Sequence, residues 1–137
     1  MPWSVNYIAQ QEIVQAVAVG KVDNEDFDQL LEQIVHRLRQ HHSQLALVDC
    51  SSALSEATLP ALYYLPDKAA LLKAPWLLRI ALVGPSNGYR GDTYRFTELI
   101  FRSNGYDFRL FDTRKQAEDW LLHPPPKNSP PLYLAHV

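Results

Sequence analysis

The residues whose types could do chemistry gather behind two apolar runs of the sequence. Asp49 directly follows the run 45–48, and a loop with three glycines, residues 84–93, follows the largely apolar run 77–83. If both runs are parallel strands, these residues lie at the carboxyl edge of one sheet, where open α/β sheets bind ligands. The candidate partner-binding or ligand-binding residues at this edge are Asp49, Ser86, Asn87, Tyr89, Arg90 and Arg95.

The loop 84–93 has some features of an anion-binding loop. It leads into a predicted helix start, where backbone N–H groups favour a negative charge, and Arg90 and Arg95 add positive charge. The Lys-Ser/Thr ending of a P-loop is absent, so an ordinary connecting loop is the favoured interpretation.

No set of residues predicts catalysis or metal binding. Cys50 follows Asp49, and a neighbouring carboxylate raises the pKa of a thiol where a nucleophile needs a lower one. His36 and His41 are five residues apart, on different faces of a predicted helix, and no Cys or carboxylate lies at metal-ligand spacing from them. The acidic residues within 23–28 open that helix and are interpreted as capping groups. We therefore predict a non-enzymatic protein with no cofactor and no metal site.

A second candidate surface is apolar. The segment 59–76 has more apolar side chains than one core-facing helix stripe needs. We expect a protein partner, a second subunit or a small apolar ligand to cover the excess. The aromatic residues of this candidate surface are Tyr63, Tyr64 and Trp76.

The first elements are predicted from the period of the apolar residues. Alternation over residues 5–9, followed by the apolar residues of 13–19, indicates a β-hairpin. From Phe27 the apolar residues recur at three and four positions, which indicates an amphipathic helix with Asp23 or Asn24 as its N-cap.

A short apolar run at 45–49 predicts a strand buried on both faces, which implies a parallel sheet, and 77–83 predicts another buried strand. A last strand is predicted at 108–111. Thr113 and Gln116 then form a capping-box pattern that opens a last helix.

The helices between these strands are predicted from caps and breakers. Thr58 is expected to cap a short helix, with Pro60 in its first turn and a second short helix restarting at Pro66. A helix over 92–104 is expected to end before Gly105 in the left-handed conformation. The predicted element order is ββαβαβαβα, an α/β fold with a mixed five-stranded sheet.

Composition predicts one compact domain. The chain has 137 residues, 47% of them hydrophobic, which excludes an intrinsically disordered chain. The formal net charge of −2 lacks the basic excess of a nucleic-acid-binding protein, so we expect no nucleic-acid partner. The prolines concentrate at the end of the chain, where 123–137 holds five of the ten. We expect a domain over 1–122 and a proline-rich tail over 123–137.

Location is predicted from the absence of targeting signals. No apolar run approaches the roughly 20 residues that span a bilayer, so no transmembrane segment is expected. The first residues form neither a basic nor an apolar leader region, and Cys50 is the single cysteine. A cytoplasmic location is the expectation.

The sequence resembles the STAS domain, and more narrowly the SpoIIAA-like, STAS/SEC14-type bacterial proteins. The resemblance covers roughly residues 4–122. It depends on Val48-Asp49 at the end of the third strand and on the closing pattern Phe111-Asp112-Thr113 through Ala117-Glu118-Asp119-Trp120-Leu121. It implies a STAS-like sandwich and a non-enzymatic regulatory or protein-interaction module, such as an anti-sigma factor antagonist. The SEC14-type likeness implies the alternative, a carrier of a small apolar or lipid-like ligand.

The resemblance also implies a place for a phospho-acceptor. In the family, an Asp-Ser-Ser-Gly motif about eight residues after the strand-ending Asp carries the acceptor serine. Here that place is Ala57-Thr58-Leu59-Pro60, without the acid and the glycine. Thr58 is thus either a phospho-acceptor or a plain helix cap, and Ser51 and Ser52 are the other candidates for these roles.

The tail raises the possibility of a homodimer. It contains Leu132, Tyr133, Leu134 and Val137, apolar residues that favour burial against a surface. Either the body of the domain or a second subunit must supply that surface. We favour a second subunit, so self-association in which the tail takes part is the expectation.

Overall fold

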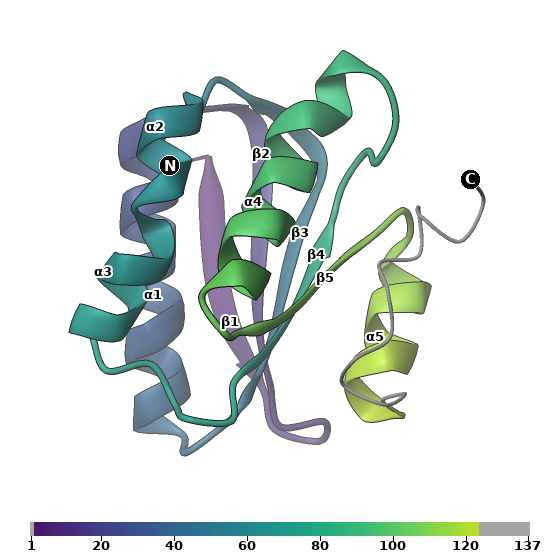
Figure 1. The fold of residues 1–137 in the computed structure, drawn as a ribbon. Helices are drawn as coiled ribbons and strands as arrows, with labels where there is room; N and C mark the ends of the chain where they lie inside the picture. Colours follow the sequence, from purple (N-terminus) through teal and green to yellow (C-terminus); the bar gives the residue numbers. More distant parts are fainter. Residues whose placement is uncertain (1, 124–137) are drawn as a thin grey trace.

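The protein is described by a computed structural model over residues 2–123 (Figure 1). Most of the predicted tail lies outside these residues, and so does its expected part in a homodimer. In chain order the elements are β1 (Trp3–Ile8), β2 (Ile13–Val22), α1 (Asn24–Gln40), β3 (Leu45–Ser55), α2 (Leu59–Tyr63), α3 (Leu65–Leu71), β4 (Arg79–Val83), the 3-10 turn η1 (Tyr89–Gly91), α4 (Asp92–Ser103), β5 (Asp107–Phe111) and α5 (Arg114–Leu122). The predicted order of elements is confirmed, with the second helix broken into two.

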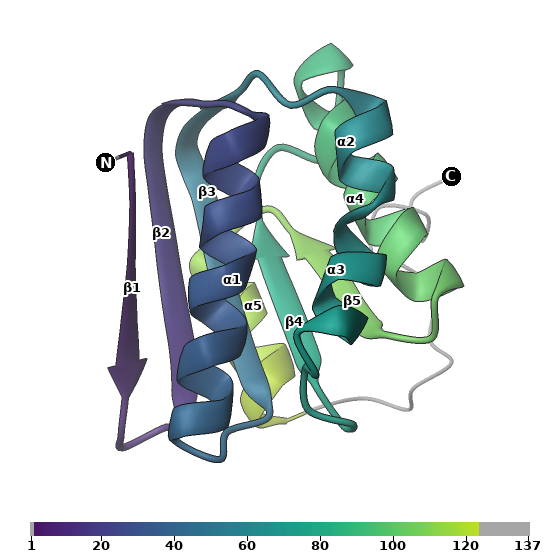
Figure 2. The same ribbon diagram turned by 90° about the vertical axis from the view of Figure 1, so that its left-hand side faces the viewer.

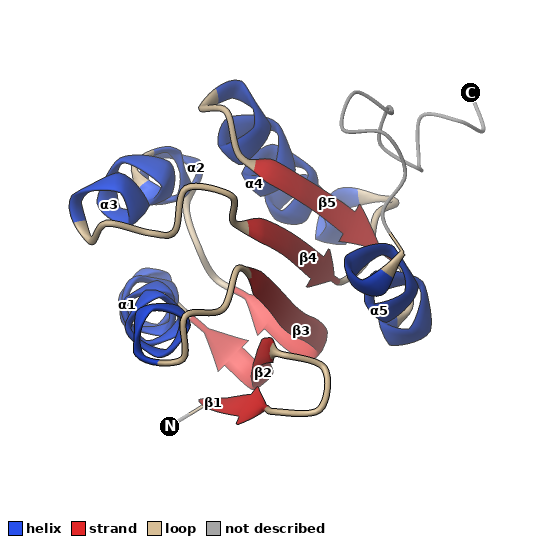
Figure 3. Ribbon diagram, turned by 90° about the horizontal axis from the view of Figure 1, so that it is seen from below, coloured by secondary structure: helices blue, strands red, loops and turns tan. Residues whose placement is uncertain are grey.

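The five strands form one sheet in the order β1-β2-β3-β4-β5. β1 is antiparallel to β2, and the other neighbours are parallel, so the sheet is mixed as predicted. Helices α1 to α4 lie on one face and α5 lies alone on the other, as Figure 3 shows from below. Within residues 2–123, every helix is too short or too polar to cross a membrane.

Each face of the sheet has its own apolar core. The core under α1 to α4 includes Val14, Ala46 and Leu82 from successive strands. The smaller core under α5 is built around Leu47, Ala81 and Trp120. Alternate residues of β3 and β4 thus enter opposite cores, which is why these strands read as continuous apolar runs.

The third strand is longer than predicted. It continues beyond Asp49 to Ser55, because β2 runs beside it as far as Val22 after an irregularity between Val17 and Val19. The prediction that the strand ends at Asp49 is therefore wrong. Backbone hydrogen bonds to β2 hold the polar extension, and these bonds need no apolar side chains.

The capping residues of the helices confirm the sequence interpretation. Asp23 forms a capping box with Asp26 at the start of α1, and Thr113 forms one with Gln116 at the start of α5. Thr58 caps α2, and Gly105 has a φ of 87° after α4, as expected. These signals are local in sequence, so they need no knowledge of the tertiary structure.

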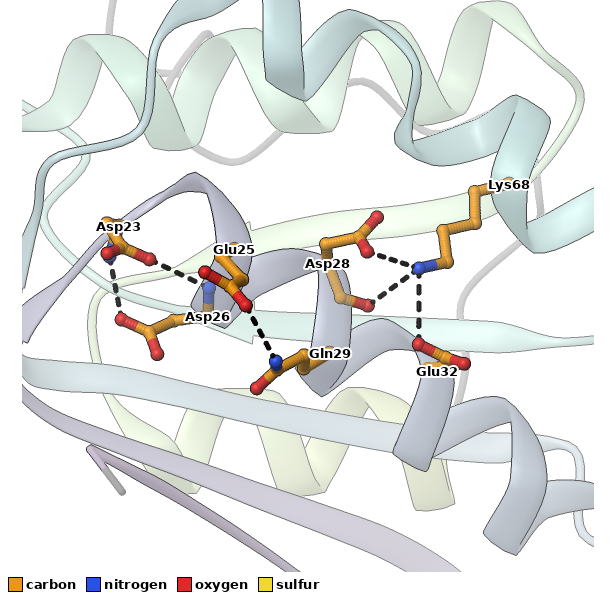
Figure 4. A network of polar contacts seen from close by, with 7 residues as sticks. All are labelled: Asp23, Glu25, Asp26, Asp28, Gln29, Glu32 and Lys68. Carbon is orange, nitrogen blue, oxygen red and sulfur yellow. Dashed lines mark hydrogen bonds and ion pairs between the residues drawn. The ribbon is translucent and has the colours of Figure 1, made fainter.

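The acidic start of α1 caps that helix and also fastens α3 (Figure 4). Lys68 of α3 forms ion pairs with Asp28 at 2.5 Å and with Glu32 at 3.3 Å. Glu25 accepts a hydrogen bond from Gln29 one turn further along the helix. The side chains of the cluster therefore have structural partners.

The outer edge of β5 is covered by α4. Among the described strands β5 pairs with β4 alone, and the buried Glu98 of α4 accepts a hydrogen bond from the backbone N–H of Leu110 at 2.6 Å. Arg102 of the same helix donates to the carbonyl of Phe108 at 3.4 Å. These two side chains satisfy backbone groups that an edge strand otherwise leaves open.

Replacing Glu98 with alanine tests this edge. The change removes a buried carboxylate and leaves the N–H of Leu110 without its acceptor. We therefore expect the free energy of unfolding to fall by about 3–5 kcal/mol. Urea denaturation measures it, with Glu56→Ala as a control on an exposed side chain, where the effect should stay within the scatter of surface substitutions. Equal effects of the two changes would contradict the role of Glu98.

Candidate functional site

The carboxyl edge of the sheet carries a groove of about 450 Å³. β3 pairs with β4 only as far as Asp49 and Val83, and beyond that point β3 stays with β2. The chain after β4 therefore separates from β3, and the groove lies between them. Its walls come from the end of β3, from the loop 84–91, from the start of α4 and from the residue after β5; the principal lining residues are Ser51, Leu54, Ser55, Pro85, Tyr89, Arg90, Thr93, Tyr94 and Asp112.

The loop beside the groove is braced from within. Ser86 is buried, and its hydroxyl donates to Asp112 Oδ1 at 2.7 Å. Arg95 donates to the carbonyl of Ser86 and to that of Gly88, the latter at 3.1 Å, and pairs with Asp92. Two predicted binding residues, Ser86 and Arg95, thus hold the loop in shape.

The close contacts of Ser86 and Arg95 leave room only for glycine at position 91. A Cβ at this position would lie 2.7 Å from the carbonyl carbon of Ser86 and 2.5 Å from Nη1 of Arg95. Because the first of these atoms is backbone, any side chain would force the loop apart.

Three of the predicted loop residues face solvent. Asn87, Tyr89 and Arg90 are exposed, and Tyr89 is 81% exposed, which is high for a large aromatic residue. Tyr89 and Arg90 both line the groove. They are therefore the predicted residues best placed to contact a ligand or partner there.

Asp49 lies within β3, at the last residue that pairs with β4, and its carboxylate has partners on both oxygens. Its Oδ1 accepts hydrogen bonds from the backbone N–H of Ser51 at 2.9 Å and from the Ser51 hydroxyl at 2.6 Å. Asp49 thus fixes the local conformation of the residue two positions further along the strand. Its Oδ2 lies 3.7 Å from Nη1 of Arg114.

Arg114 is a residue that sequence reasoning missed. It joins Asp49 to Glu118 of its own helix at 3.0 Å and also donates to Gln15 of β2. The i,i+4 spacing to Glu118 is visible in the sequence, but the contacts with β2 and β3 are made only after folding.

The candidate phospho-acceptors differ in their surroundings. The Thr58 hydroxyl accepts from the Ala61 N–H at 3.4 Å and from Asn24 Nδ2 at 3.3 Å, while Asn24 Oδ1 accepts from the Thr58 N–H at 2.8 Å. Thr58 thus joins the starts of α2 and α1 and acts as a cap. Ser51 and Ser52 are exposed on β3.

The thiol of Cys50 is not suited to nucleophilic chemistry. The residue is fully buried, and burial together with the Asp49 charge raises the pKa of the thiol to about 12. At neutral pH the sulfur is therefore protonated and unable to act as a thiolate. Within residues 2–123, no three side chains of the types that bind metals come together.

Tyr94 is a buried side chain with an unused polar group. It is 4% exposed, and its hydroxyl has no hydrogen-bond partner among the described residues. Burial raises the pKa of this hydroxyl, so it remains a neutral donor. The ring packs on Gly84, where an added Cβ would lie 3.4 Å from its atoms.

A small apolar cavity of about 70 Å³ lies between the sheet and helices α1, α2 and α4. It shares three lining residues with the groove, namely Ser55, Thr93 and Tyr94. Three hydroxyl-bearing side chains therefore line both the open groove and the apolar interior.

The predicted apolar surface residues are exposed but do not line this groove. Tyr63 and Tyr64 lie at the end of α2 and are 54% and 63% exposed. Trp76 is 95% exposed in the connection from α3 to β4, which Figure 2 places at the opposite end of the molecule from α2. The three aromatics thus form two separate surfaces.

Comparison with known proteins supports the fold. No protein-family model and no curated protein matches the chain. The structure of an uncharacterized protein of the DUF3478 family from Shewanella loihica PV-4, described as having a SpoIIAA-like fold, matches with a TM-score of 0.54. The match covers 87% of this chain and 93% of that chain at 20% sequence identity. The chain therefore has a SpoIIAA-like α/β fold, as the resemblance in sequence implied.

Two arginines of the loop region should respond differently to substitution. Arg95→Ala removes the bonds to two loop carbonyls, so we expect the melting temperature to fall by about 3–6 °C. Arg90→Ala removes an exposed side chain with no hydrogen bond or ion pair to the described residues, and the melting temperature should hardly change. Thermal unfolding followed by circular dichroism measures both. If Arg90→Ala lowered the melting temperature more than Arg95→Ala, Arg90 would have a structural role.

Proposed function

We propose that the chain is a non-enzymatic regulatory or interaction module that holds a segment of a partner protein in the groove at the carboxyl edge. The observation that carries this proposal is the exposure of Tyr89 and Arg90 on a loop that Arg95 and Ser86 hold rigid. A rigid loop loses little conformational entropy on binding, so its exposed side chains are suited to recognition.

The chemistry of the groove supports binding rather than catalysis. Its described lining residues include no histidine and no cysteine, so they offer no imidazole base beside a hydroxyl. The Ser51 hydroxyl already donates to Asp49, and Asp49 faces Arg114. The side chains that line the groove thus lack a nucleophile paired with a base, the arrangement that covalent catalysis needs.

The lining indicates what kind of segment fits. Leu54, Pro85 and Tyr89 offer apolar contact, and Arg90 offers a cation at the rim. An extended partner segment with an apolar side chain next to an acidic one matches this arrangement.

A carrier of a small apolar ligand is the second candidate, favoured by the apolar cavity behind Ser55, Thr93 and Tyr94. Its 70 Å³ is less than half of the roughly 150 Å³ that accommodates benzene, so the helices around the cavity must move for a ligand of that size to enter. A carrier purified from its host should retain a ligand mass in native mass spectrometry, whereas an interaction module should not.

The proposal is tested by photo-crosslinking in the host cell. A photoreactive amino acid at Asn87, beside the groove, should yield a discrete adduct whose protein component mass spectrometry identifies. The same amino acid at Lys115, an exposed position on α5, is the control and should not yield that adduct.

Affinity for the recombinant partner then locates the surface. We expect Tyr89→Ala and Arg90→Ala each to weaken binding about tenfold or more, with unchanged melting temperatures. Tyr63→Ala, which removes a tyrosine from the α2 surface, should leave the affinity unchanged. If Tyr63→Ala weakened binding while Tyr89→Ala and Arg90→Ala did not, the partner would bind at α2, and the proposed role of the groove would be wrong.

A further inference from the structure

The two edges of the sheet are protected to different degrees. At β5, Glu98 of α4 accepts from the N–H of Leu110, and Arg102 donates to the carbonyl of Phe108, so two outward backbone groups have partners. At the other edge, β1 pairs only with β2 among the described residues. In Figures 2 and 3, β1 is the outermost strand of the sheet and no described element lies beyond it.

β1 also lacks the devices that usually block such an edge. Its sequence, Trp-Ser-Val-Asn-Tyr-Ile, has no charged residue and no proline. Exposed edges are commonly blunted by lysine, proline or a bulge, because an open strand accepts another strand. The pairing of β1 with β2 is regular over all six residues. The edge is therefore open to strand addition.

The register fixes which backbone groups point outward. The Val19 N–H donates to the carbonyl of Pro2 at 2.7 Å, which marks that pair as hydrogen-bonded. Bonded and non-bonded pairs alternate in an antiparallel ladder, so Ser4 is also bonded to β2. It follows that Trp3, Val5 and Tyr7 direct their N–H and C=O groups to the open edge.

We propose that a second copy of this chain pairs with this edge, with the two β1 strands antiparallel about a two-fold axis beside Val5. Val5 then lies opposite the partner's Val5, and Trp3 lies opposite the partner's Tyr7. By symmetry, Tyr7 lies opposite the partner's Trp3, which makes three pairs. Each pair exchanges two hydrogen bonds, and the two five-stranded sheets become continuous.

The strand is complementary to itself in this register. On the helix-covered face, aromatic residues meet aromatic residues and valine meets valine, which are favourable cross-strand pairs. On the opposite face, Ser4 meets the partner's Asn6, and both side chains are exposed and polar. One register thus pairs aromatic with aromatic, valine with valine and polar with polar side chains, and this self-complementarity favours a second copy over a strand of unrelated sequence.

The dimer leaves the groove accessible. The groove lies between β3 and the loop after β4, whereas β1 is the far edge strand of the same sheet. The inference is therefore independent of the proposed function. One pair of six-residue strands is a small interface, so we expect a reversible equilibrium that depends on concentration.

Sedimentation equilibrium of the full chain over a wide range of concentration tests the inference, with variants designed for the register. In the proposed dimer, position 4 of one copy lies opposite position 6 of the other. The double change Ser4→Lys and Asn6→Lys therefore places two ammonium groups opposite each other on each side of the two-fold axis. We expect the dimer dissociation constant to rise about tenfold or more. The change Ser4→Glu with Asn6→Lys instead creates two opposite-charge pairs in the same register, and dimerisation should be retained or tightened.

Melting temperatures of the monomers provide the folding control, since both variants alter exposed residues only. A wild-type chain that is monomeric at every concentration would overturn the proposal. A dimer that both variants form equally well would also overturn it, and would place the interface on another surface, such as the one around Trp76.

Discussion

The divergence of β3 from β4 is the constraint on which the candidate site depends. β3 hydrogen-bonds to both neighbours up to Asp49 and to β2 alone from there to Ser55. Strands stay together only while both chains are extended, and the chain after Val83 turns away into the loop. This separation creates the groove. Asp49 lies at the point where the two strands diverge, and its carboxylate accepts hydrogen bonds from Ser51 and faces Arg114.

Helix α4 connects the sheet edge to the groove. Glu98 and Arg102 fasten the helix to β5, Tyr94 places its ring on Gly84, and Arg95 braces the loop. These side chains lie on successive turns of one helix, so the position of the helix against β5 also sets the shape of the groove. A change that loosens the β5 edge is therefore expected to alter the loop as well.

The sequence was sufficient wherever a signal is local. The caps of α1, α2 and α5 and the break between α2 and α3 follow from residues close together in sequence, such as Asp23, Thr58 and Pro66. The extension of β3 was missed, because its small polar residues pair with β2, which lies some thirty residues earlier in the chain.

The structure gives local roles to several of the residues that the sequence proposed at the sheet edge, and binding of a partner there stays a prediction. Ser86 and Arg95 brace the loop after β4 through contacts that depend on folding and that the sequence alone does not show. Arg114, Glu98 and Tyr94 were missed, because their partners lie on other elements and are defined only by packing.

The unpartnered hydroxyl of Tyr94 is a buried polar group beside the groove that packing alone does not explain. A buried donor without an acceptor lowers the free energy of unfolding by about 1–3 kcal/mol, which other interactions in the fold must offset. Phenylalanine would fill the same space without the cost, so packing alone does not explain a tyrosine here. Tyr94 lines both the groove and the apolar cavity, but its hydroxyl is enclosed, so an acceptor brought by an occupant reaches this group only if the surrounding side chains move. The groove as the structure has it therefore offers contacts from its other lining side chains and leaves the cost at Tyr94 in place.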